Sequence, residues 1–222
     1  MSSAASPFEK FTSLARLFPL PNLVLFPHVI QPLHIFEPRY RQMARDALAG
    51  DRLITLVLLQ PGWETSYEGR PPLHEVACVG RIIAEQALDD GRFNLLVRGE
   101  DRARIIQEVE TDKPYRSARM DLLQDVAMSN AEREQSLRQE LTAHAPAAFT
   151  AAGALLEQLE KLLQSDLTLG ALCDILAFAL PLEVEVKQQF LQELDVESRA
   201  RNLLDRLRPA PDRRFPPDFS SN

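Results

Sequence analysis

His74, Glu75 and Cys78 have side chains and a spacing that come close to those of a metal centre. A zinc-binding His-Glu-x-x-His motif holds its two ligands on one face of a helix, and here a cysteine would replace the second histidine. Residues 76–87, however, show the alternation of a strand, on which positions four apart lie about 13 Å from each other. One ion cannot contact both side chains at that distance, so we expect neither a metal nor another cofactor.

The positions of the lysines exclude nucleotide hydrolysis through a phosphate-binding loop. Such a loop needs a Gly-Lys pair, because the lysine must reach the β- and γ-phosphates of the nucleotide. No glycine precedes any lysine of this sequence, and the lysines are Lys10, Lys113, Lys161 and Lys187. We therefore expect no ATP hydrolysis by this route.

Trp63 and Tyr67 are the candidate binding residues, because they are the two aromatic residues of a loop predicted at residues 60–72. The glycines and prolines of this segment are typical of a surface loop. Loops on a rigid scaffold often carry binding sites, and an amphipathic aromatic ring offers a large contact area at low entropic cost. An apolar side chain of a peptide is the expected partner. The alternative is structural, with the tryptophan folded back over the domain.

The composition indicates a globular protein that does not bind polyanions. Of its 222 residues, 45% are hydrophobic and 26% are charged, and no segment is apolar for long enough to cross a membrane. Residues 1–124 carry 15 basic and 16 acidic residues and residues 125–222 carry 10 and 16, so their net charges are −1 and −6. Nucleic-acid binding is disfavoured, since it depends on clustered cations. The N-terminus does not look like a secretory signal, so we expect a cytoplasmic protein with Cys78 and Cys173 reduced.

The first part of the chain predicts short strands followed by one helix. Five prolines among the apolar residues of 14–38 exclude a helix there and favour strands joined by rigid turns, with the apolar side chains buried. Pro38 then occupies the first turn of a helix with an apolar face, and Gly50 provides a left-handed end. Residues 53–59 form a continuous apolar run of strand length.

The middle of the chain alternates with a period of two, which predicts a β domain. A hairpin turn is expected at residues 89–91, where Gly91 allows a positive φ. With the helix inserted near the start, the pattern indicates a mainly antiparallel sheet that curls to hide its edges. Arg98, Arg102 and Arg104 could form a basic strip, but the acidic residues between them favour a solvated face. The strands are expected at 76–87, 92–98, 102–109 and 115–123.

After residue 124 the pattern becomes helical. Ser129 and Glu132 have the spacing of a capping box, Thr168 and Asp195 are expected N-caps, and Pro181 interrupts the series. Helices are expected at 130–145, 150–164, 168–180, 182–193 and 196–208. The sequence thus predicts an α+β fold in four parts: a flexible start at 1–13, a β domain at 14–124, a helical bundle at 125–208 and a flexible tail at 209–222.

Several segments resemble the amino-terminal substrate-binding domain of Lon proteases. Residues 18–27 (FPLPNLVLFP) and 32–41 (PLHIFEPRYR) are similar to the opening signature of that domain. The resemblance spans about residues 14–208, and its further motifs follow in the family's order: VGRII at 79–83, LDDGRFNLLVRG at 88–99, KPYRSAR at 113–119 and the helical segment 180–199.

The resemblance implies a PUA-like β pseudobarrel with one inserted helix, followed by a C-terminal helical bundle. It also implies a non-catalytic module that recognises unfolded or apolar polypeptide segments, as an adaptor or holdase in protein quality control, with full-length Lon protease as a further partner. No lysine lies in the glycine-rich turn that a Ser/Lys peptidase would need, so we expect a stand-alone form without ATPase or peptidase. An RNA-binding PUA-like protein and a small hydrolase are the alternatives.

The residues that match the family signature are expected to serve the architecture rather than binding. For Glu37 and Arg39, which flank a proline at a helix start, an ion pair or a helix cap is the expected role. The full set is Pro21, Asn22, Phe26, Pro27, Phe36, Glu37, Pro38, Arg39, Tyr40, Gly80, Asp90, Gly91, Gly99 and Tyr115.

Overall fold

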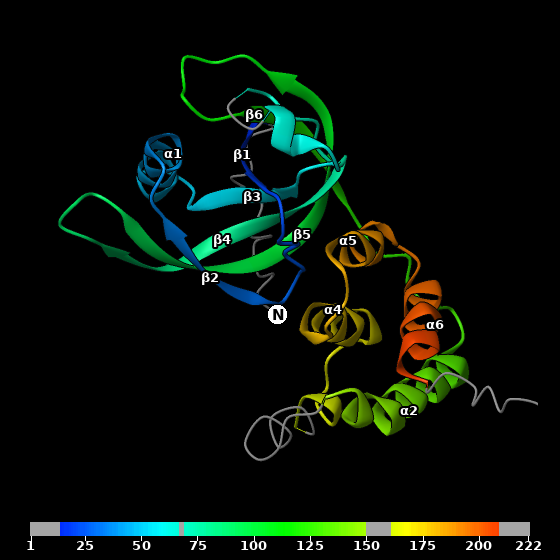
Figure 1. Ribbon diagram of the computed structural model, residues 1–222. Coiled ribbons are helices and arrows are strands. Elements are labelled where there is room, and N and C mark those ends of the chain that lie inside the picture. Colours follow the sequence, from blue (N-terminus) through cyan, green and yellow to red (C-terminus); the bar gives the residue numbers. More distant parts are fainter. Residues whose placement is uncertain (1–13, 67–68, 150–160, 209–222) are drawn as a thin grey trace, which may run out of the picture.

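The computed structural model describes residues 14–66, 69–149 and 161–208, in which a curled sheet lies between one helix on one side and a group of helices on the other (Figure 1). The strands are β1 (Leu14–Leu20), β2 (Ile30–Ile35), β3 (Leu53–Leu58), β4 (Val76–Ala87), β5 (Phe93–Val109) and β6 (Ser117–Leu123). The helices are α1 (Pro38–Leu48), α2 (Ala131–Ala148), α4 (Leu169–Ala179), α5 (Val184–Gln192), α6 (Val196–Leu207) and the short 3-10 helix η1 (Trp63–Ser66).

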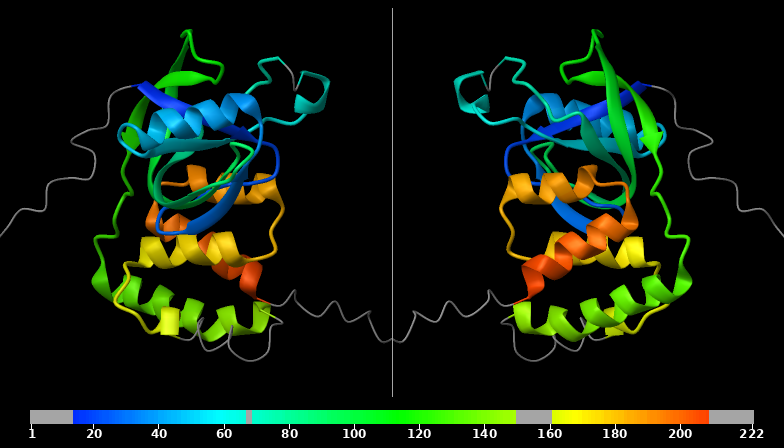
Figure 2. Two further views of the ribbon diagram at one scale, coloured as in Figure 1. Left: turned by 90° about the vertical axis from the view of Figure 1, so that its left-hand side faces the viewer. Right: turned by 90° about the vertical axis from the view of Figure 1, so that its right-hand side faces the viewer.

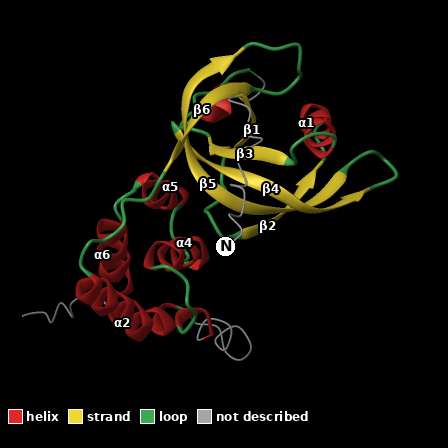
Figure 3. Cartoon of the chain, turned by 180° about the vertical axis from the view of Figure 1, so that it is seen from behind, coloured by secondary structure: helices red, strands yellow, loops and turns green. Residues whose placement is uncertain are grey.

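The sheet follows the order β2-β5-β4-β3-β1-β6, and β6 also pairs with β5. This second pairing curls the sheet back on itself, as Figure 3 shows from behind. The result is a pseudobarrel, because β2 pairs with the first part of β5 and β6 with its last part. Among the paired strands of the described residues, β1 and β3 run parallel and the other pairs run antiparallel. The predicted α+β fold, with one helix inserted between strands and a helical C-terminal part, is confirmed.

Strand β5 is a single strand of 17 residues, whereas the sequence predicts two strands at 92–98 and 102–109. The segment between them is a β-bulge. Gly80 of β4 lies opposite Gly99, and Val79 lies opposite Asp101, so that Glu100 has no partner in the register. A bulge adds one residue and bends the strand without ending it, which is why the break in alternation does not mark a turn.

Helix α1 begins and ends where the sequence predicts, but its end is built differently. Pro38 is its first residue, and its buried face packs on the sheet. Gly50 is not the left-handed residue. That role falls to Arg52, with a φ of 62°, which is held there because its backbone N–H donates to Ala47 (2.8 Å) and its Nε to the carbonyl of Ile82 (2.9 Å).

The helices of the C-terminal part start at the predicted caps, with one exception. The side chains of Thr168 and Asp195 accept hydrogen bonds from the third residues of α4 and α6. Helix α2 is capped by Asn130 instead of Ser129, and the two residue types are about equally good caps. Most of the helix predicted at 150–164 lies outside the described residues. No described helix is long and apolar enough to cross a membrane.

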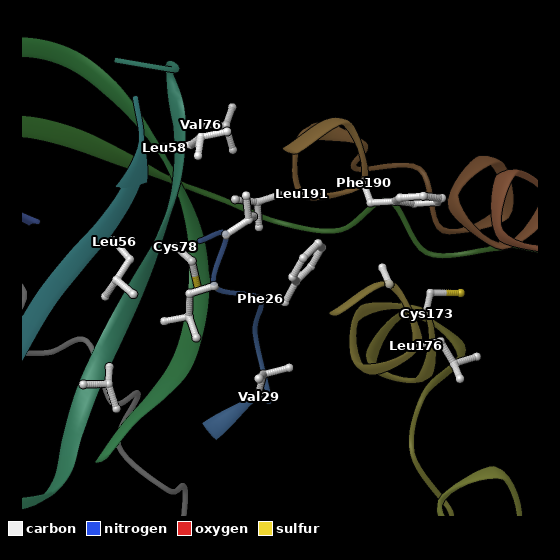
Figure 4. Close-up of a cluster of buried hydrophobic side chains, with 14 of the residues drawn as sticks. Phe26, Val29, Leu56, Leu58, Val76, Cys78, Cys173, Leu176, Phe190 and Leu191 are labelled. Carbon is white, nitrogen blue, oxygen red and sulfur yellow. The ribbon is translucent and has the colours of Figure 1, made fainter. Parts of the chain in front are cut away.

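One hydrophobic cluster joins the sheet to the helices. Phe26, which is fully buried, lies between the strands and the helices (Figure 4). From the sheet the cluster takes Leu56, Leu58, Val76 and Cys78, and from the helices Cys173, Leu176, Phe190 and Leu191. A second cluster fills the inside of the pseudobarrel and includes Leu17, Val57, Val79, Ala103 and Met120. Since the first cluster spans both parts of the chain, the division at residue 124 stays a prediction.

A buried ion network crosses the same junction. Arg102 of β5 is only 3% exposed, so the expectation that it lies on a solvated face is wrong. Its guanidinium donates to both carboxylate oxygens of Asp174 on α4, at 2.5 and 3.0 Å, and to the carbonyl of Leu191 at 2.9 Å. Arg199 of α6 contacts the same carboxylate at 3.5 Å and donates to Asp125 at 3.1 Å. Charges buried this deeply are stable only in such pairs.

Gly99→Ala should destabilise the protein strongly. A Cβ at this position would lie 2.0 Å from the carbonyl oxygen of Phe26, which is backbone and cannot swing away. We expect a loss of about 3 kcal/mol in the free energy of unfolding, measured by urea denaturation. Gly50→Ala is the matched control, because its nearest atom would be 3.3 Å away. If the two variants unfolded at a similar urea concentration, the close approach of the Phe26 backbone to Gly99 of β5 would be contradicted.

Arg102→Ala should also be destabilising, because it leaves Asp174 buried without its main partner. Breaking a buried ion pair from one side costs about 3–5 kcal/mol, whereas the exposed Arg104 on the same strand should tolerate alanine within about 0.5 kcal/mol. The double variant Arg102→Met with Asp174→Leu should recover much of the loss. Equal effects of Arg102→Ala and Arg104→Ala in urea denaturation would argue against a structural role for the network.

Candidate functional site

A cleft of about 640 Å³ opens where three segments distant in the sequence meet. They are the start of α1, the end of the loop between β3 and β4, and the connection between β5 and β6. A cleft of this size could hold a few side chains of a peptide. It is lined by Pro19, Leu59 and residues 37–40, 69–71, 109–111 and 113–116.

Asp46 of α1 fastens the β5–β6 connection to the helix. Its carboxylate accepts hydrogen bonds from the Tyr115 hydroxyl (2.7 Å) and the Gln42 amide (2.8 Å), and pairs with the Lys113 ammonium (3.2 Å). Partial burial alone would raise the pKa of Asp46, but these donors hold the pKa below its ordinary value. Two walls of the cleft are therefore joined by a carboxylate that stays charged.

Arg116 fastens the same connection to the third wall. It donates to the carbonyl of Pro71 at 2.7 Å and to the carboxylate of Glu108 at 2.8 Å. Arg70 binds that carboxylate from the loop side, at 2.9 Å. The hydrogen bonds from Arg116, followed by those from Arg70, lower the pKa of Glu108. All three walls of the cleft are thus joined by side-chain contacts before any ligand binds.

The charges of the cleft are balanced internally. Its four cationic side chains each contact a carboxylate: Arg39 with Glu37, Arg70 and Arg116 with Glu108, and Lys113 with Asp46. Most of the remaining lining is proline, tyrosine and aliphatic. Such a cleft offers little attraction to a phosphate, and it favours an uncharged ligand.

The family-signature residues divide into two groups. Glu37, Pro38, Arg39, Tyr40 and Tyr115 line the cleft, which sequence reasoning did not predict. Most of the others lie away from the cleft. Phe26 and Pro27 are buried, Gly99 lies against the backbone of Phe26, and Gly80 lies against Val97. Asp90 and Gly91 form the β4–β5 turn, with a φ of 77° at the glycine. Pro21 is half-buried and Asn22 is exposed after β1.

Trp63, one of the two aromatic residues singled out in the sequence, does not line the cleft. Trp63 is half-buried at the start of η1, in a loop that projects from the body of the protein (Figure 2). The same loop returns through residues 69–71, which form one wall of the cleft. Tyr67 lies outside the described residues. Trp63 is therefore connected to the cleft through its loop, and its role in binding stays a prediction.

Several apolar side chains of β2, β5 and β4 are exposed, away from the cleft. Ile30 is 51% exposed, Leu96 is 41% exposed and Ile83 is 39% exposed. Next to β2, Phe36 is 59% exposed, so the expectation that the apolar side chains of 14–38 are all buried is wrong. Buried and exposed residues alternate along β2, and this alternation indicates an exposed face. One face of the strand packs with α1, and no element among the described residues covers the other face.

The two cysteines are poor nucleophiles. Cys78 and Cys173 are free and fully buried. Burial raises the pKa of both thiols, that of Cys173 to about 12, so neither forms the thiolate that nucleophilic attack needs. His74 lies 3.2 Å from Glu185 of α5, and no group of three potential metal ligands occurs in the described ranges.

Comparison with known proteins identifies relatives among the Lon proteases. The chain is 27% identical to Lon protease of Dictyoglomus thermophilum over 84% of its length, and 30% identical to that of Syntrophus aciditrophicus over 87%. These alignments cover 23% and 25% of the two relatives, so the chain spans about a quarter of their length.

The fold is shared with solved amino-terminal domains. A Lon N-terminal domain protein from Xanthomonas campestris superimposes with a TM-score of 0.62 at 23% identity, and the N-terminal domain of the Mycobacterium avium complex Lon protease with 0.66 at 18%. Each match covers 97% of that domain and 86% or 87% of this chain. The sequence profile of the ATP-dependent protease La (LON) substrate-binding domain matches residues 15–208, and the chain therefore belongs to this family.

Proposed function

We propose that this protein binds short, uncharged segments of unfolded polypeptide in the cleft beside α1, without chemistry of its own. The observation that carries the proposal is the internal pairing of every cationic side chain in that cleft. Binding there depends on shape and apolar contact, which suits unfolded segments of many sequences. Contacts with a few side chains yield roughly micromolar affinity once the ordering costs are subtracted.

The same reasoning supports a role as an adaptor or holdase in the cytoplasm. The buried thiols and the absence of a Gly-Lys pair favour a module that presents polypeptide rather than cleaving it. Membership of the Lon substrate-binding family makes a Lon protease a candidate recipient of the bound polypeptide.

Binding can be tested with a carboxymethylated, permanently unfolded protein as the probe. We expect it to bind at tens of micromolar or below, and its folded parent not to bind. Raising the salt concentration from 50 to 500 mM should change the affinity little, because no net charge is neutralised. Affinity for structured RNA that falls steeply with salt would instead favour the nucleic-acid alternative.

Thr111→Trp should weaken binding by about tenfold, which corresponds to ~1.4 kcal/mol. Thr111 is exposed and lines the cleft, so an indole at this position fills space that the ligand needs. Asp112→Trp is the matched control, since Asp112 is the next residue, is also exposed and does not line the cleft. Equal binding of the probe by the two variants, measured by fluorescence anisotropy, would move the site away from the cleft.

Trp63 offers a direct optical test of its loop. It is the single tryptophan of the sequence, so the intrinsic fluorescence reports on this position alone. Addition of an unfolded, tryptophan-free polypeptide should shift the emission maximum to the blue, because a half-buried indole loses water when a ligand covers it. Thr111→Trp cannot be used in this assay. An unchanged spectrum at saturating probe would exclude Trp63 from the binding surface.

A further inference from the structure

Strand β2 has a single neighbour in the sheet. It pairs with β5 from Ile30 opposite Arg98 to Ile35 opposite Phe93, whereas every other described strand pairs with two or more. The outer edge of β2 therefore carries backbone groups that no described strand uses. An edge of this kind can accept a strand from another chain, either from a second copy or from an extended polypeptide.

The composition of β2 makes this edge a hazard. Its sequence, IQPLHI, contains no acidic residue, no lysine and no arginine. Ile30 and the neighbouring Phe36 are 51% and 59% exposed. Short segments with β-branched and apolar residues, low charge and no proline are those that stack most readily into intermolecular sheets. Pro32 is the feature of β2 that departs from this description.

The hydrogen-bond pattern places the backbone nitrogen of Pro32 on the outer edge. The Gly99 N–H donates to the carbonyl of Val29 at 2.8 Å, and this pair continues the β2–β5 register by one residue. Bonded pairs alternate with non-bonded pairs in an antiparallel ladder. The odd-numbered residues of β2 therefore direct their backbone groups at β5, and the even-numbered residues, including Pro32, direct theirs away from it.

The other side of β5 leads to the same assignment. The Leu88 N–H donates to the carbonyl of Arg92 at 2.9 Å, at the end of the β4–β5 ladder. By the same alternation, Leu96 directs its backbone groups at Ala84 of β4. Leu96 is also the residue of β5 that lies opposite Pro32, so its groups point away from the proline. A proline at this position therefore costs the sheet no hydrogen bond.

The acceptor at the same position is already engaged. The side-chain amide of Gln31 donates to the carbonyl of Pro32 at 2.8 Å. The centre of the outer edge thus offers an incoming strand no donor and an acceptor that is already bonded. A strand that paired there would bury a carbonyl without a hydrogen-bond partner, which is unfavourable.

We propose that Pro32 and Gln31 together close the outer edge of β2 to strand addition. They keep a second copy of this chain, or an extended client, from joining the sheet through backbone hydrogen bonds. A protein that holds unfolded polypeptide meets extended backbones continually, and with this edge closed its binding is left to the side-chain contacts of the cleft. The closure itself does not depend on the proposed function.

Amide hydrogen exchange of the full chain, followed residue by residue by NMR, tests the geometry. In the wild-type protein the Gln31 and Leu33 amides should exchange slowly, because they bond β5. The Ile30 and His34 amides should exchange at least about tenfold faster, because they face the open edge. Equal protection of these four amides would overturn the assignment of the outer edge.

Two substitutions should open the edge, since Gln31→Ala frees the carbonyl and Pro32→Val supplies an N–H. We expect the double variant to self-associate at least about tenfold more tightly than the wild-type chain in sedimentation velocity, and its His34 amide to become protected as the concentration rises. Asn94→Val is the matched control. Asn94 is exposed and lies opposite His34 on β5, so a valine there adds apolar area beside the edge without changing its backbone groups. Continued protection of the Leu33 amide verifies that each variant is folded.

Two results of this experiment would overturn the closed edge. The first is a folded double variant that sediments like the wild-type chain at every concentration. The second is equal self-association of the double variant and Asn94→Val, because apolar area and not the edge would then be the cause.

The carboxymethylated unfolded protein separates the closed edge from the proposed function. The double variant with Thr111→Trp added should bind this probe at least about tenfold more tightly than Thr111→Trp alone, because the opened edge does not use the cleft. Equal binding by these two proteins would overturn the closure against clients. If the wild-type chain did not bind the probe, the proposed cleft function would fail, whereas self-association of the double variant would still support the closed edge.

Discussion

The guanidinium of Arg102 imposes the constraint on which the arrangement of this protein depends. It comes from the middle of β5, points into the junction between sheet and helices, and is 3% exposed. A charge in that position must be neutralised by partners brought from elsewhere in the chain. Asp174 of α4 supplies the carboxylate and Leu191 of α5 the carbonyl. Arg102 therefore joins β5 to two helices by polar contacts within the apolar cluster.

The same use of charge recurs on the surface. Asp46 and Glu108 each form hydrogen bonds or ion pairs with side chains of other segments. These contacts join the walls of the cleft. Because these cations and anions pair with one another, the charges of the cleft largely cancel. This accounts for how a protein with 26% charged residues can have a cleft in which every cationic side chain contacts a carboxylate.

The sequence predicted those features that depend on local pattern. The alternation over Val76–Ala87 matches β4 residue for residue, and Pro38 marks the start of α1. Features that depend on contacts between distant segments were missed. Arg102 looks like any charged residue of an alternating strand, and its burial follows from an aspartate 72 residues away. The cleft was missed for the same reason: Tyr40, Arg70 and Tyr115 belong to three separate segments, and the signature identified the first and last without indicating that they meet.

The unbroken course of β5 has a mechanical consequence. The start of β5 pairs with β2, and its last residue, Val109, lines the cleft. Between them, just after the bulge, Arg102 contacts α4 and α5. A force applied at the cleft end of this strand would be transmitted along it to the helical part. The hydrogen bonds to β4 and β6 lie across the strand, so a pull along its axis loads them together in shear instead of opening them one at a time.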